Sequence, residues 1–74
     1  MNKIRRKRIQ EAISKLEEAK QILEEVQVEE QDAFDNLPGS LQDSGKGEQM
    51  CDNISFLDDV VSDLDDQMGQ LEEL

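Results

Sequence analysis

The last third of the chain carries a regular apolar repeat that limits what the whole chain can fold into. Apolar side chains recur there at alternating steps of four and three residues, at Met50, Ile54, Leu57, Val61, Leu64, Met68 and Leu71. This spacing is the heptad stripe of an α-helix that packs against another helix. An isolated helix of this length is marginal in water, so the remainder of the chain has to supply a partner.

Residues 2–35 are predicted to form that partner helix. They contain no glycine or proline and are rich in Glu, Lys, Gln, Leu and Ala, which are strong helix formers. Ile9, Leu16 and Leu23 define one position of the seam, and Glu30 falls on the same position near the end of the helix. The second seam position is then expected to hold Ala12, Ala19, Val26 and Ala33, with Ile13, Ile22 and Phe34 beside the seam.

Residues 36–46 are predicted to form the turn. Pro38 disfavours a helical Leu37, and Asn36 tolerates a left-handed helix cap, so the first helix should stop near Asp35. Two restart points remain open, because Ser40 and Ser44 could each cap a helix. We expect a short helical turn around 40–43 and a second helix over about 47–73, beginning within 45–48. Leu37 and Leu41 should fill the closed end of the hairpin.

The predicted fold is all-α: one antiparallel helical-hairpin domain over residues 1–74, a coiled coil. A core of this size seldom supplies more than about 3–5 kcal/mol without a staple. Cys51 is the only cysteine and histidine is absent, so neither an internal disulfide nor a zinc site is available. A second apolar stripe favours a homodimer, a four-helix bundle, as the staple. Its self-association residues are expected to be Ile13, Ile22, Phe34, Phe56 and Val60.

Charge is distributed unevenly along the chain. The net charge is −11, from 19 acidic and 8 basic residues, and five of the basic residues lie between Lys3 and Arg8. In a hairpin these bases should pair with Glu72, Glu73 and the terminal carboxylate. A nucleic-acid site at Lys3–Arg8 is the weaker alternative, because no aromatic side chain is interleaved with the bases. The acidic remainder disfavours nucleic acid and anionic membranes and favours basic proteins as partners.

The acidic residues themselves form columns at heptad spacing. Residues 9–74 carry 19 acidic residues and only three bases, Lys15, Lys20 and Lys46, which gives a net charge of −16. Spread over a rod of about 40 Å, this is about one charge per 2.5 Å, against about one per 1.7 Å in duplex DNA. The surface can therefore either imitate a phosphate backbone or simply keep a coiled coil soluble, and the sequence leaves both readings open. The candidate partner-binding residues are Glu11, Glu17, Glu18, Glu24, Glu25, Asp58, Asp59, Asp65 and Asp66.

Catalytic, metal and cofactor motifs are not found. The run Gly39–Gly47 lacks the spacing, the hydroxyl residue and the preceding strand of a phosphate loop. The aspartates around Asp63 lack the ligand order of a calcium loop, and Cys51 has no histidine to activate it. We expect no enzyme and no cofactor. No apolar run is long enough to span a bilayer, and no signal peptide is evident, so a cytoplasmic protein is expected.

The segment from Asp35 to Glu48, with the pattern DNLPxSLQxSxxGE, resembles a group of small uncharacterised helical-hairpin proteins of phages and prophages. The chain departs from that group at Gly39 and Gly45, where a helix-favouring residue is expected. The resemblance implies a phage accessory role in the host cytosol and no catalytic residues. It favours an acidic hairpin that binds a basic surface of a host protein, as an anti-defence or DNA-mimic inhibitor of a nucleic-acid-handling protein. The alternative is a structural oligomerisation module or phage assembly component.

Overall fold

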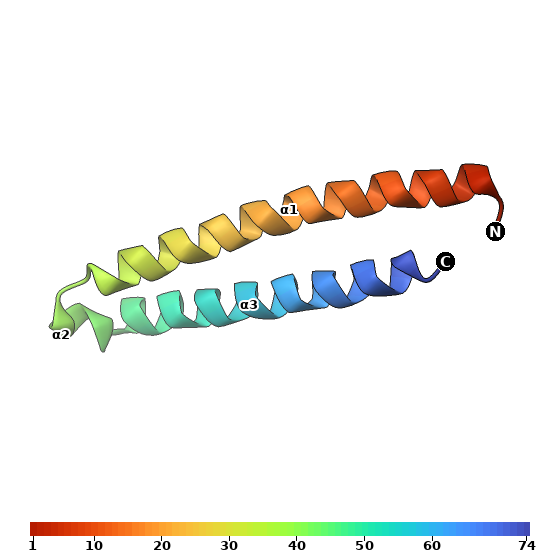
Figure 1. Ribbon diagram of the computed structural model, residues 1–74. Helices are drawn as coiled ribbons and strands as arrows, with labels where there is room; N and C mark the ends of the chain where they lie inside the picture. The colour runs from red at the N-terminus through yellow and green to blue at the C-terminus, as the bar shows by residue number, and fades with distance from the viewer.

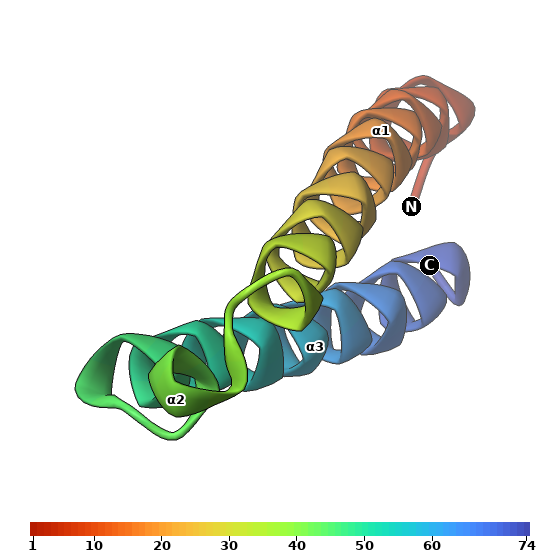
Figure 2. The same cartoon turned by 90° about the vertical axis from the view of Figure 1, so that its left-hand side faces the viewer.

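The computed structural model describes residues 1–74 and contains three helices and no strand: α1 (Lys3–Asp35), α2 (Gly39–Gln42) and α3 (Gly45–Glu72). The two long helices run antiparallel and side by side, joined at one end by the short α2 (Figure 1). Viewed from that end, α1 and α3 cross at an angle (Figure 2). The hairpin measures 58 × 15 × 12 Å, so nearly every residue lies close to its surface.

The apolar repeat of α3 packs against α1 as its spacing predicts. Met50 and Met68 are the most buried side chains of this helix, with 9% and 5% of their surface exposed. The other residues of the repeat are half-buried. Gly47, one turn before Met50, continues the buried stripe toward the hairpin turn. The seam predicted for the second helix is therefore confirmed along its whole length.

The seam of α1 differs from the prediction at one of its two positions. Ile9, Leu16, Leu23 and Glu30 are half-buried, as expected for one position. The residues expected at the second position are all exposed: Ala12, Ala19, Val26 and Ala33. The residue that follows each member of that column takes its place, so the second position holds Ile13, Lys20, Gln27 and Phe34. The large side chains at positions 13 and 34 fill the space between the helices, which alanines at 12 and 33 would leave empty.

Residues 36–44 form a tight connection held by specific backbone contacts. α1 ends at Asn36 in an ordinary right-handed conformation, so the expected left-handed cap is wrong. The Pro38 carbonyl then accepts hydrogen bonds from the amides of Leu41 and Gln42, which closes the single turn of α2. The side-chain amide of Gln42 reaches back and donates to the Phe34 carbonyl at 3.2 Å.

α3 starts at Ser44, which resolves the choice between the two candidate caps. The Ser44 side chain accepts from the Gly47 amide at 3.5 Å and donates to the Leu41 carbonyl. Gly47 is buried against the preceding turn, and a Cβ there would overlap the Gln42 carbonyl oxygen and lie 2.7 Å from the Leu41 oxygen. Gly39 and Gly45 have open space around them. Only Gly47 is therefore required by close packing in this turn.

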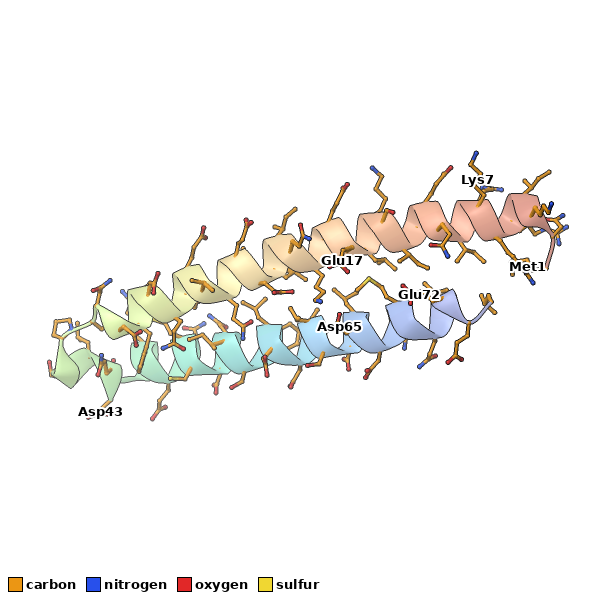
Figure 3. The ribbon with its side chains drawn as sticks, viewed as in Figure 1. Met1, Lys7, Glu17, Asp43, Asp65 and Glu72 are labelled. Atoms are coloured by element: carbon orange, nitrogen blue, oxygen red, sulfur yellow. The ribbon has the colours of Figure 1, made fainter.

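The N-terminal end of α1 extends past the end of α3 (Figure 1). Ile9 lies near the last turn of α3, where it lines a shallow depression with Leu71 and Leu74. None of the bases from Lys3 to Arg8 forms an ion pair, and Lys7 points away from α3 (Figure 3). The expected pairing with Glu72 and Glu73 is therefore wrong, because most of these bases lie beyond the α3 turns that would have to supply the carboxylates.

Candidate interaction surface

Polar side chains interrupt the seam of α1, and each of them has a partner. The Gln27 amide donates to the Ile54 carbonyl at 3.3 Å, and the Asn53 amide donates to Glu30 at 3.1 Å. No buried polar side-chain atom in the hairpin lacks a hydrogen-bond partner. These contacts remove the cost of placing polar groups between the helices, and they fix which residues of α1 lie opposite which residues of α3.

Lys20 is a half-buried charged residue in the seam of α1. Its ammonium lies 2.6 Å from the carboxylate of Asp65 on α3 and 3.6 Å from that of Glu24, and only 17% of its side chain is exposed. The hydrogen bond that Lys20 donates to the Asp65 carboxylate is the largest effect on the pKa of Lys20 and raises it above its ordinary value. Desolvation opposes this shift, and the negative charges of Asp65, Glu17 and Glu24 add smaller increases. Lys20 therefore stays charged and joins the two helices across the seam.

One long side of the hairpin is rich in carboxylates, and we call it the acidic face. All nine candidate partner-binding residues are exposed. Because antiparallel helices place equivalent flanking positions on the same side, Glu17 and Glu24 of α1 line this face together with Asp58 and Asp65 of α3. Figure 3 shows Glu17 and Asp65 at the same level along the rod. The remaining five candidates lie on the outer backs of the two helices: Glu11, Glu18, Glu25, Asp59 and Asp66.

Three of the nine candidate carboxylates already form ion pairs within the hairpin. Glu24 and Asp65 hold Lys20, although 49% and 53% of their side chains remain exposed. Glu18 lies 3.9 Å from Lys15 in an exposed pair on one helix. The other candidates make no ion pair, so most of the acidic surface is available for a partner.

The opposite long side is apolar and almost free of carboxylates, and we call it the apolar face. Ile22 is 59% exposed and Phe56 is 67% exposed, although both are large apolar side chains. Only two carboxylates, Glu29 and Asp63, occupy the columns of this side. The residues of the apolar face are Ala12, Ala19, Ile22, Val26 and Ala33 of α1 with Asn53, Phe56, Val60 and Gln67 of α3.

The five expected self-association residues divide between the inside and the outside of the hairpin. Ile13 is 9% exposed and Phe34 is half-buried, and both lie in the seam between α1 and α3, so their predicted place beside the seam is wrong. Ile22 and Phe56 are exposed, and Val60 is half-buried at the edge of the seam. The sequence analysis did not predict that Lys20 lies in the seam. Its position seven residues from both Ile13 and Gln27, in the same helix column, could have indicated this.

Outside these two faces the hairpin carries a free thiol and a mainly polar depression. No group of histidine, cysteine or acidic side chains is placed to hold a metal ion. Cys51 is an exposed free thiol. A depression of about 540 Å³ on the outside of α1 is lined by Val28 and four polar residues, Gln21, Glu24, Glu25 and Glu29. None of the helices has a stretch that is both apolar and long enough to cross a membrane.

Comparisons with protein-family models, with curated proteins and with solved structures find no match to this chain. The distribution of charge and apolar surface over the hairpin is therefore the basis for its proposed function.

Proposed function

We propose that this protein is a non-enzymatic interaction module whose acidic face binds a basic surface of another protein. The observation that carries this proposal is the separation of charge on the hairpin: carboxylates line one long side and the backs of both helices, while the opposite side has only Glu29 and Asp63. A coating that served solubility alone would not require this separation, since charges spread over every exposed column would serve equally well.

The shape of the hairpin supports an extended partner surface. The hairpin is a rod 58 Å long, and the carboxylates of the acidic face project from both of its long helices. A basic groove that accepts a nucleic-acid strand presents a similar line of positive charge. We therefore propose a nucleic-acid-handling protein as the partner, with the hairpin acting as an inhibitor that imitates the phosphate backbone. By the resemblance of its turn to phage proteins, the hairpin would act in the cytosol of a host cell.

The test compares two pairs of substitutions that change the net charge equally. Glu17→Gln with Asp58→Asn removes the two carboxylates of the acidic face that form no ion pair, and Glu29→Gln with Asp63→Asn removes two carboxylates on the apolar side. A partner captured from host lysate should bind the first variant at least about tenfold more weakly and the second almost normally. Its affinity for the unchanged hairpin should fall as salt rises.

Equal losses in the two variants would show that net charge alone attracts the partner, and affinity independent of salt would overturn the electrostatic mechanism. The alternative function, a structural oligomerisation module, is favoured by one specific observation, the exposed apolar face. In that case Glu17→Gln with Asp58→Asn should retain function, and substitutions on the apolar face should remove it.

A further inference from the structure

We propose that the apolar face binds a second copy of this chain, with the two hairpins stacked face to face and antiparallel. The twofold axis would pass between the two copies of Ile22 and between the two copies of Val60. This inference does not depend on the proposed function, because it concerns the opposite side of the hairpin. It rests on the pattern of side chains and charges along that side.

The side chains along α1 are arranged so that two antiparallel copies of the helix complement each other. Residues 8, 15, 22 and 29 share one column of the apolar side, since they are seven apart. Suppose that this column packs antiparallel against the same column of a second copy, with the two Ile22 side chains facing each other. Lys15 of one copy then lies opposite Glu29 of the other. The same axis places Ala19 opposite Val26, so a small side chain meets a large one and the two helix backbones can approach closely.

α3 independently indicates the same position for the twofold axis. Its apolar-side column contains Asn53, Val60 and Gln67, and reversal around Val60 places the two amides, Asn53 and Gln67, opposite each other. Lys20 lies opposite Asp65, and Gln27 lies opposite Ile54. These contacts place Ile22 and Val60 within about one helical turn of the same height along the rod. One twofold axis therefore satisfies both helices.

The net charge of the chain also limits where a second copy can bind. A chain with a net charge of −11 repels its own copies, so a dimer needs a side that is not negative. The apolar side is the only such side: its columns hold Arg5, Arg8, Lys15 and Lys46 together with Glu29 and Asp63. None of these six residues forms an ion pair with the other helix, and only Lys15 has a partner at all, the exposed Glu18 at 3.9 Å.

The available area is sufficient for a stable dimer. The long side of the hairpin has an outline of 58 × 15 Å. A standard interface buries about 800 Å² on each partner, which is close to the area of this outline. Stacking would cover Ile22, Phe56 and Val26, three of the large apolar side chains that are now exposed.

Two residues of equal exposure provide the test. Ile22 on the apolar side and Val28 on the other side of α1 are both 59% exposed in one hairpin. Sedimentation equilibrium should show a dimer for the unchanged chain. Ile22→Asp should raise its dissociation constant at least about tenfold, whereas Val28→Asp should leave it unchanged, with helix content checked by circular dichroism.

Cross-linking tests the position of the axis. In a Cys51→Ser background, Ile22→Cys should form a disulfide-linked dimer under mild oxidation, since residues on a twofold axis bring their Cα atoms within about 7 Å. Val28→Cys should remain a monomer on a non-reducing gel. Lys15→Glu should weaken the dimer, and adding Glu29→Lys should restore it.

The proposal is overturned if the unchanged chain is monomeric at all accessible concentrations. It is also overturned if Ile22→Asp and Val28→Asp have equal effects, or if Val28→Cys cross-links as readily as Ile22→Cys. A dimer that forms without linking through Ile22→Cys has another arrangement and rejects the antiparallel stacking.

Discussion

The two long helices meet along one seam but contribute to it in different ways. α3 supplies an uninterrupted apolar stripe from Met50 to Leu71, and α1 supplies a stripe that includes Lys20, Gln27 and Glu30. The polar members of α1 are held by Asp65, Ile54 and Asn53 of α3. The apolar helix therefore provides the driving force for association, and the polar contacts of the other helix fix its rotation and register.

The rotation of α1 determines what the hairpin shows to solvent. With Ile13 and Phe34 in the seam, the alanine column that begins at Ala12 turns outward and forms part of the apolar face. The opposite choice would have buried the alanines and exposed Ile13 and Phe34. Substitutions in both helices test this difference between them.

Truncation of the buried seam of α1 should have the largest effect. Ile13→Ala should lower the free energy of unfolding by about 2 kcal/mol, at the low end of the range for buried aliphatic residues because the core is thin. Its neighbour Ala12→Ser should cost no more than about 0.5 kcal/mol. Urea denaturation at one fixed protein concentration measures both, and equal losses would mean that the seam of α1 is assigned wrongly.

Replacing either of two glycines of α3 by alanine should change the stability of the hairpin, in opposite directions for the two positions. Gly47→Ala should destabilise the hairpin by about 1–3 kcal/mol, because the added methyl group overlaps the backbone of the preceding turn. Gly69→Ala has open space around it and should stabilise α3 by up to about 1 kcal/mol. Thermal unfolding of the two variants provides the comparison. A stable Gly47→Ala hairpin would show that the turn packs differently.

The cap of α3 should have an intermediate effect. Ser44→Ala removes the side-chain contacts to Gly47 and Leu41 and should cost about 1 kcal/mol. Ser62→Ala, at an exposed position within the same helix, should be neutral or slightly stabilising because alanine is the better helix former. If both serines respond alike to thermal unfolding, helix propensity rather than capping controls the start of α3.

Alkaline pH should produce the smallest change. The pKa of Lys20 is raised in the folded chain, so its contribution is complete below the unfolded value of about 10.4 and is lost as pH rises through the folded value. Stability measured above that pH should fall more in the unchanged chain than in Lys20→Met, which lacks this group. Parallel curves for the two proteins would rule out a contribution from Lys20 titration.

Much of the fold could be predicted from the sequence because only one apolar stripe runs along the whole length of α3. Its polar columns are strongly charged, so no other rotation would bury as much apolar surface. The place of the turn could also be predicted, since Pro38 acts through local backbone chemistry, but the choice between Ser40 and Ser44 as the cap of α3 was left open. The hairpin itself follows from these two features together.

The rotation of α1 could not be predicted in the same way, because two stripes compete. One includes Ala12, Ala19, Val26 and Ala33, and the other includes Ile13, Lys20, Gln27 and Phe34. Counting apolar residues favours the first stripe. The second is chosen because it places larger side chains between the helices and because the chain supplies partners for Lys20 and Gln27, which periodicity alone does not reveal.

The acidic residues were found from the sequence, but their arrangement was not. The columns at heptad spacing predict exposed carboxylates, and all nine candidates are exposed. That they leave one long side nearly free of negative charge depends on the rotation of α1 and on the antiparallel pairing. The apolar face could therefore not be predicted without the rotation and pairing of both helices.

A double-mutant cycle between Lys20 and Asp65 tests the central claim, the rotation of α1, most directly. Unfolding free energies would be measured for the unchanged chain, Lys20→Met, Asp65→Asn and the double variant, with the exposed Lys15–Glu18 pair as the reference cycle. The rotation described here predicts a coupling between residues 20 and 65 that clearly exceeds that of the reference pair. A coupling no larger than the reference would place Lys20 outside the seam and contradict the account.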